Sequence, residues 1–80
     1  MYEVYGKPTC NKCVMTKKLL DDLEVEYVFV DLGTSQITKA DMDRWSGKDL
    51  RALPQIFIRE GAHSQYFGEY EDLVREYQEL

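Results

Sequence analysis

The N-terminal part of the chain carries two kinds of hydrophobic pattern, one typical of strands and the other typical of a helix. Residues 2–6, YEVYG, alternate in polarity and run into a Gly-Lys-Pro sequence, which predicts a short strand followed by a loop. Over residues 11–23 apolar side chains recur every four positions, which predicts an amphipathic helix whose buried face carries Met15, Leu19 and Leu23. Residues 26–32, EYVFVDL, form a continuous β-branched and aromatic run, as expected for a strand covered on both faces.

A second helix is predicted in the middle of the chain. It begins after Thr38, whose hydroxyl can cap the first turn while Asp41, three residues on, returns the contact. We expect Trp45 on the buried side of this helix, which ends at Ser46-Gly47.

The C-terminal part predicts a hairpin and a last helix. Residues 55–60, QIFIRE, form a strand, residues 61–64 make a turn, and residues 64–68 return as an edge strand. The last segment, 70–80, has apolar side chains at helical spacing, namely Tyr70, Leu73, Val74, Tyr77 and Leu80.

The predicted order is therefore βαβαββα in a single domain, 1–80. A βαβ unit makes its two strands parallel, and the added hairpin makes the four-stranded sheet mixed, with helices on both faces. The fold class is α/β. Periodicity alone gives the core candidates Tyr2, Val4, Val28, Val30, Ile56, Ile58, Leu73 and Val74.

Charge and hydropathy limit the binding partners and the cellular location that we expect for the protein. The net charge of −5 argues against general binding of nucleic acid. No apolar run approaches the ~20 residues that span a bilayer, and the segment after Met1 is too short and polar for an export signal. We therefore expect a cytoplasmic protein without a membrane partner. Four lysines nevertheless lie close in sequence to the chain's only cysteines. Lys7 and Lys12 flank Cys10, whereas we interpret Lys17 and Lys18 as part of a solvated helix face.

Cys10 and Cys13 admit three interpretations. A disulfide between them would close a very short loop and constrain the unfolded chain little, so a stabilising bridge is a poor explanation. A structural zinc site needs four ligands, whereas the chain offers two cysteines and the distant His63, so we expect no metal. The third interpretation is redox exchange.

The position of Cys10 favours exchange. Thr9-Cys10 meets the predicted helix start, where unpaired backbone N–H groups and the helix dipole stabilise a thiolate, the reactive form. Cys13 lies one turn later on the same side and can resolve a mixed disulfide formed on Cys10. A Cys-x-x-Cys sequence beside a βαβ pattern is a recognised redox signature.

The Leu53-Pro54 pair enters the third strand beside this site. A cis proline there would turn the backbone groups of Leu53 toward a neighbouring cleft and a bound peptide. Local sequence alone favours the trans form, because only about one X–Pro bond in twenty is cis.

Together these segments resemble the glutaredoxins, small redox proteins of the thioredoxin superfamily. The resemblance lies in the CNKC sequence at a helix start, in LPQIFI (53–58) with the segment before it, and in GEYEDL (68–73). It covers nearly the whole chain in the right order. It implies a thioredoxin fold and glutathione-coupled reduction of disulfides, with glutathione as co-substrate and no bound cofactor.

The resemblance also implies residue roles. Cys10 is the nucleophile and Cys13 the resolving thiol, and Pro54 is cis. The glutathione surface comprises seven residues: Lys7, Thr9, Lys12, Leu53, Pro54, Glu71 and Asp72. Within it Lys7 meets a glutathione carboxylate, the Leu53 backbone pairs with the glutathione cysteine, and Asp72 takes the γ-glutamyl end. The implied client is a disulfide-bearing protein such as ribonucleotide reductase, served by a monomer.

Two departures from the family pattern keep alternatives open. Asn11-Lys12 replaces the usual Pro-Tyr between the cysteines, and Glu69 replaces a glycine beside the expected glutathione groove. A redoxin of this kind that is re-reduced by thioredoxin reductase is therefore the second hypothesis. The third is a carrier of an iron–sulfur cluster held between two protomers by Cys10 and glutathione.

Overall fold

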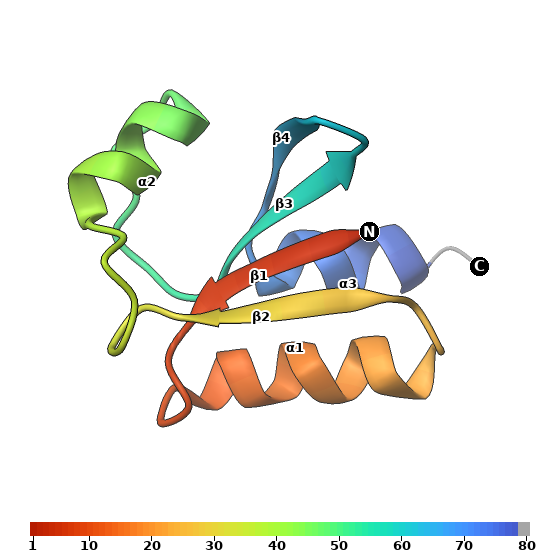
Figure 1. Ribbon diagram of the computed structural model, residues 1–80. Helices are drawn as coiled ribbons and strands as arrows, with labels where there is room; N and C mark the ends of the chain where they lie inside the picture. Colours follow the sequence, from red (N-terminus) through yellow and green to blue (C-terminus); the bar gives the residue numbers. More distant parts are fainter. Residues whose placement is uncertain (79–80) are drawn as a thin grey trace.

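The computed structural model describes residues 1–78 and has the predicted order βαβαββα. The four strands form one mixed sheet in the order β2-β1-β3-β4, in which β1 runs parallel to β2 and antiparallel to β3 (Figure 1). The elements are β1 (Tyr2–Gly6), α1 (Asn11–Asp22), β2 (Tyr27–Asp31), α2 (Lys39–Ser46), β3 (Gln55–Glu60), β4 (His63–Gly68) and α3 (Tyr70–Gln78).

The helices cover the two faces of the sheet unequally. α1 and α3 lie on one face, where a fully buried cluster joins them to the central strands through Val4, Leu20, Ile56 and Leu73. α2 lies over part of the other face, where the buried residues are Tyr5, Met42, Leu50 and Phe57. Both packing layers follow from the strand period of two, which sends Val4 to one face and Tyr5 to the other.

The prediction for β2 is wrong in one respect. Val28 and Val30 were expected in the core, yet Val28 is 42% exposed and Val30 is only half-buried. The reason is that β2 is an edge strand, and α2 does not extend over it. The other core candidates are buried or half-buried.

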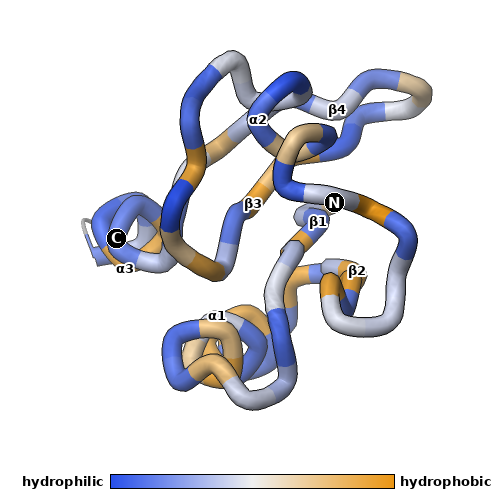
Figure 2. The backbone as a smooth tube through the Cα atoms, turned by 90° about the vertical axis from the view of Figure 1, so that its left-hand side faces the viewer, coloured by the Kyte–Doolittle hydropathy of each residue, from blue (hydrophilic) through white to orange (hydrophobic). Residues whose placement is uncertain are grey.

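The buried face of α1 also differs from the prediction. Met15 and Leu23 are exposed, and the buried positions are instead Cys13, Thr16 and Leu20. These three keep a helical spacing, but Cys and Thr give a weak hydrophobic signal, and Figure 2 shows hydrophilic and hydrophobic residues mixed around this helix. The buried Thr16 hydroxyl donates a hydrogen bond to the Lys12 carbonyl at 2.7 Å.

Three smaller outcomes concern α2 and the C-terminal part. The capping box of Thr38 and Asp41 is present, and Gly47 ends the helix in a left-handed conformation. Trp45 is 47% exposed rather than buried. β4 begins at His63, so the hairpin turn is only residues 61–62. The prediction for Leu80 lies outside the described residues. Within residues 1–78, no helix is both long and apolar enough to cross a membrane.

Candidate active site

Cys10 is the N-cap of α1. Its backbone is extended, and its Sγ accepts a hydrogen bond from the Cys13 backbone N–H at 3.3 Å. The sulfur therefore takes the place that a side-chain oxygen takes in an ordinary cap, facing the unpaired N–H groups of the first turn. Cys10 is half-buried, so its sulfur remains accessible. This is the position that the sequence predicted.

Cys13 differs from Cys10 in that its side chain is fully buried. Burial, with a further contribution from its contact with Cys10, raises the pKa of the Cys13 thiol to about 12. At neutral pH this thiol is therefore protonated and out of reach of an external disulfide. The two cysteines are chemically unequal, although they lie in the same helical turn.

The burial of Cys13 depends on Gly6 at the end of β1. A Cβ built on Gly6 would overlap Cys13 Sγ and would stand 3.3 Å from Cys13 Cβ. Only a residue without a side chain lets the sulfur pack against the strand here. The sequence suggested Gly6 only as a strand end, so its part in the site was missed.

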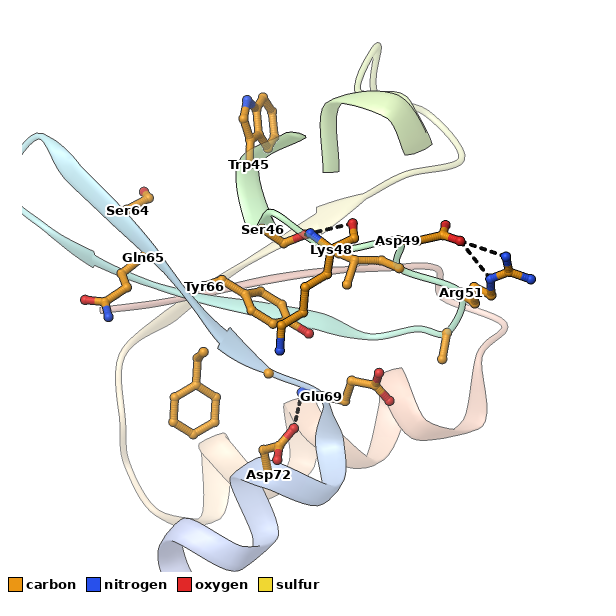
Figure 3. Close-up of a pocket in the computed structure, with 14 residues that line it drawn as sticks. Trp45, Ser46, Lys48, Asp49, Arg51, Ser64, Gln65, Tyr66, Glu69 and Asp72 are labelled. Atoms are coloured by element: carbon orange, nitrogen blue, oxygen red, sulfur yellow. Dashed lines mark hydrogen bonds and ion pairs between the residues drawn. The ribbon is translucent and has the colours of Figure 1, made fainter. Parts of the chain in front are cut away.

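Asp72 lies at the start of α3 and already has two partners. Its Oδ2 accepts from the Glu69 backbone N–H at 2.8 Å, drawn in Figure 3, and its Oδ1 accepts from the Arg75 guanidinium at 2.9 Å. The Glu69 N–H, followed by the Arg75 contact, lowers the pKa of the Asp72 carboxyl. The carboxylate is still 41% exposed and can be approached from solvent.

Lys12 and Glu71 form an ion pair between α1 and α3. Their side chains are 56% and 48% exposed, so the pair is open to solvent and to exchange of partners. The sequence assigned both residues to the glutathione surface but did not foresee their contact, because 59 positions separate them. In this structure the charge between the two cysteines is already neutralised.

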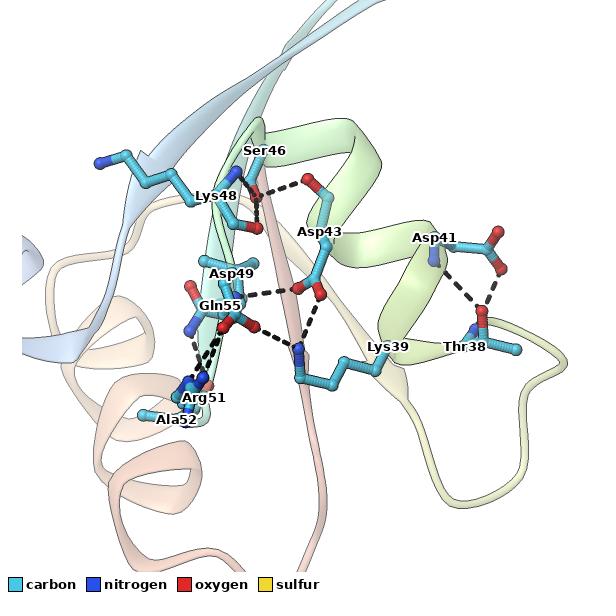
Figure 4. Close-up of polar contacts among 11 residues, drawn as sticks. Thr38, Lys39, Asp41, Asp43, Ser46, Lys48, Asp49, Arg51, Ala52 and Gln55 are labelled. Atoms are coloured by element: carbon cyan, nitrogen blue, oxygen red, sulfur yellow. Dashed lines mark hydrogen bonds and ion pairs between the residues drawn. The ribbon is translucent and has the colours of Figure 1, made fainter.

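The loop before β3 brings Leu53 to Cys10. The Leu53–Pro54 peptide bond is cis, as the family resemblance implied and contrary to the local expectation. The Cys10 thiol donates to the Leu53 carbonyl at 3.6 Å. Polar contacts hold the loop, among them Leu50 N–H to Asp43 Oδ1 at 2.9 Å and Gln55 Nε2 to the Ala52 carbonyl at 2.6 Å (Figure 4).

The remaining predicted residues are spread around this centre. Lys7 and Thr9 are exposed in the loop between β1 and α1, and the Lys7 carbonyl accepts from the Cys10 N–H at 3.1 Å. Lys7 and Leu53 line one cavity of about 320 Å³. Lys17, expected as solvated, lies over the Phe29 ring at 4.6 Å, whereas Lys18 is exposed. No group of three potential metal ligands occurs in residues 1–78.

The comparisons with known proteins agree with this geometry. The family model described as Glutaredoxin matches residues 2–63. The chain is 37% identical to Glutaredoxin 1 of Salmonella typhimurium over 69% of each chain, and 32% identical to Glutaredoxin 1 of Escherichia coli over 89% of this chain and 85% of that one.

Solved structures show the same fold. Reduced E. coli glutaredoxin superposes with a TM-score of 0.76 at 30% identity, over 99% of this chain and 98% of that chain. A buckwheat glutaredoxin–glutathione complex gives a TM-score of 0.79 at 23% identity, over 98% of this chain and 68% of that one. The fold is therefore the α/β thioredoxin fold, as expected. The chain belongs to the glutaredoxin family, the glutathione-dependent thiol–disulfide oxidoreductases of the thioredoxin superfamily.

Proposed function

We propose that the protein reduces protein disulfides by a dithiol cycle in which Cys10 attacks and Cys13 resolves, and that it reduces glutathione mixed disulfides through Cys10. The observation that carries this proposal is the unequal exposure of the two thiols. Cys10 is accessible at the helix N-terminus, whereas Cys13 is fully buried and protonated. Only one of the two sulfurs can meet an incoming disulfide.

The cycle proceeds by thiol–disulfide exchange. The Cys10 thiolate forms a bond to one sulfur of the client disulfide, and the other client sulfur leaves with the electron pair and takes a proton. Cys13 then loses its proton and attacks Cys10 Sγ, which releases the reduced client and leaves a Cys10–Cys13 disulfide. Two glutathione molecules, reacting in turn, restore both thiols and leave as oxidised glutathione.

The geometry supports this division of labour in two ways. The Cys13 backbone N–H donates to Cys10 Sγ, which stabilises a thiolate there both as attacker and as leaving group. Cys13 lies within the same turn, so no large movement of α1 is needed for its attack. Burial, with a smaller contribution from Cys10, raises the pKa of Cys13 and keeps this thiol from reacting with disulfides in solution.

We assign glutathione to the surface that surrounds Cys10. Lys7 would meet its glycine carboxylate, the Leu53 backbone beside Pro54 its cysteine, and Asp72 its γ-glutamyl end. Lys12 and Glu71 would have to give up their mutual contact to bind it. Thr9 would be the remaining residue of this glutathione surface. We further propose that the protein acts as a monomer in the cytoplasm and that its client is a protein such as ribonucleotide reductase.

One assay tests the cycle and its reductant. The oxidised protein is supplied with NADPH and either glutathione plus glutathione reductase or thioredoxin reductase alone. We expect the glutathione system to restore both thiols. Recovery with thioredoxin reductase but not with the glutathione system would overturn the assignment of the reductant. A coloured purified protein that contains iron and sulfide would instead favour the cluster carrier.

Two substitutions test the roles of the cysteines. Cys10→Ser should abolish exchange with every disulfide, because no other accessible thiol exists in residues 1–78. Cys13→Ser should retain reduction of glutathione mixed disulfides and lose the reduction of protein disulfides through the dithiol route. Residual exchange by Cys10→Ser would contradict the nucleophile assignment.

A further inference from the structure

Gln55 is a buried polar residue next to the candidate active site. It is the first residue of β3 and only 1% exposed, and the three residues that follow it in the strand are apolar. Burying a side-chain amide costs free energy unless its polar atoms form hydrogen bonds. The partners of this amide therefore identify what the side chain holds in place.

Both polar atoms of the Gln55 amide are paired. Its Nε2 donates to the Ala52 carbonyl at 2.6 Å (Figure 4). Its Oε1 accepts from the Tyr66 hydroxyl at 2.7 Å. Tyr66 belongs to β4, and its ring packs edge-on against Phe57 with the ring centroids 5.3 Å apart. The amide therefore connects the loop before β3 with a side chain that the β3–β4 hairpin itself holds.

Ala52 directly precedes the residue that faces Cys10. The Leu53 carbonyl accepts from the Cys10 thiol at 3.6 Å, so the backbone at Leu53 lies beside the reacting sulfur. The loop is also held at Leu50, whose N–H donates to Asp43 Oδ1 at 2.9 Å. Of these two contacts, the one at Ala52 is the nearer to Leu53 along the chain. It therefore has the larger influence on where the Leu53 backbone lies.

We propose that Gln55 is a positioning residue for glutathione: it holds the Ala52 carbonyl so that the Leu53 backbone meets the peptide groups of a glutathione bound at Cys10. The inference rests on the proposed function, since it concerns the glutathione surface around Cys10. Gln55 acts through the loop, and a misplacement of about 1 Å can lower a rate by about a hundredfold. A purely structural role, in which the two contacts only stabilise the hairpin and its loop, is the alternative that the test excludes.

The test compares two disulfides that differ in their use of the Leu53 backbone. Glutathione disulfide carries peptide groups that can pair with this backbone, whereas hydroxyethyl disulfide carries none. Cys13→Ser is the reference protein, so that each reaction stops at a mixed disulfide. The Cys10 thiolate bonds to one sulfur of the disulfide, and the other sulfur leaves with the electron pair and takes a proton.

The measured quantity is a ratio of rate constants. Samples are quenched in acid and the mixed disulfides are counted by mass spectrometry, which gives a second-order rate constant for each disulfide. The ratio is the constant for glutathione disulfide divided by the constant for hydroxyethyl disulfide. A loss of folded protein would lower both constants alike, so the ratio reports positioning and not stability.

Gln55→Met keeps the length of the side chain and removes both of its hydrogen bonds. We expect this substitution, made in the reference protein, to lower the ratio by about tenfold. The reason is that the Leu53 backbone would no longer be held where it pairs with glutathione, while hydroxyethyl disulfide would still reach Cys10.

Tyr66→Phe is a milder variant that acts on the same contact. It removes the hydroxyl that donates to Gln55 and keeps the ring against Phe57. We expect the ratio to fall by about fourfold, because Gln55 retains its contact with Ala52 but loses its partner on β4.

Tyr2→Phe is the matched control for the loss of a tyrosine hydroxyl. The Tyr2 hydroxyl is paired with that of Tyr77 at 3.2 Å, and its ring packs edge-on against Phe67. Tyr2 lies at the start of β1, whereas the loop that carries Cys10 follows the end of this strand. The ratio in Tyr2→Phe should equal that of the reference protein.

An unchanged ratio in Gln55→Met would overturn the proposal. If that variant does not fold, Tyr66→Phe decides in its place, and a ratio equal to that of Tyr2→Phe would overturn the proposal. A preference for glutathione disulfide that survives these substitutions contradicts this inference alone. A reference protein without any such preference would contradict the glutathione surface as well, and one that reacts with neither disulfide would contradict the role of Cys10.

Discussion

At the scale of single residues, the Cys13 thiol shows how much the fold changes the chemistry of a group. Its ordinary pKa is 9.0, and burial, together with Cys10, raises it to about 12 in the folded protein. In the unfolded chain the same thiol is exposed to water and regains its ordinary acidity. Folding is therefore linked to the protonation of Cys13.

This linkage predicts a loss of stability at alkaline pH. Below about pH 9 both states hold the Cys13 proton, so the full stability is present. As pH rises from about 9 to about 12, the unfolded state loses the proton first, and the free energy of unfolding should fall.

Denaturant unfolding under reducing conditions at about pH 8 and about pH 10.5 measures the effect. Buried tyrosines contribute a fall of the same sign, so Cys13→Ser is the control: it should lose less stability over this interval than the unsubstituted protein. Equal losses in the two proteins would contradict the raised pKa of Cys13.

At the scale of elements, the local hydrophobic pattern predicted every helix and strand, and for α2 the predicted capping box added a second signal. It failed where burial depends on a neighbour distant in sequence. The strand that contains Val28 has the composition of a core strand, but Val28 is exposed because β2 lies at the edge of the sheet. The buried face of α1 was misplaced because Cys13 and Thr16 pack against the sheet without being strongly hydrophobic.

The candidate site divides in the same way. Cys10 and Cys13 could be identified from their spacing and the helix start. The burial of Cys13 against Gly6 and the contact of Lys12 with Glu71 could not, since both join elements whose arrangement is set by the whole sheet.

The cap of α2 gives a prediction at this scale. The Asp41 N–H donates to Thr38 Oγ1 at 3.1 Å, and the Thr38 N–H donates to Asp41 Oδ2 at 3.0 Å. Thr38→Ala should lower the free energy of unfolding by about 1 kcal/mol, because the Asp41 N–H loses its acceptor. Thr34→Ala removes an exposed hydroxyl with one 3.4 Å contact and is the matched control. Equal effects in denaturant unfolding would contradict a role for the cap.

At the scale of the whole molecule, α1 and α3 cover one face of the sheet, whereas α2 covers only part of the other face. Polar side chains occupy part of the rest of that second face. The Glu3 side chain is only 7% exposed, and its carboxylate meets Arg59 Nε at 2.9 Å and Ser64 Oγ at 2.8 Å. These three residues come from β1, β3 and β4, so the contact joins three strands where α2 does not cover them.

Arg59→Leu should therefore lower the free energy of unfolding by about 1–3 kcal/mol, because Glu3 would be left nearly buried with a single partner. Arg51→Leu is the control, since Arg51 is 81% exposed and its pairing with Asp49 is a surface contact worth at most about 1 kcal/mol. Thermal unfolding compares the two. A smaller effect for Arg59→Leu than for Arg51→Leu would show that Glu3 needs no cationic partner.

Gly6 has a consequence for how substitutions along this chain should be judged. It has no functional group, yet the space left by its missing side chain is occupied by the sulfur of Cys13. A survey of mutational tolerance should rank position 6 with the two cysteines rather than with the loop that follows it. Along a lineage, position 6 should stay glycine even where the exposed Asn11 varies, because any larger side chain at position 6 would displace the Cys13 sulfur.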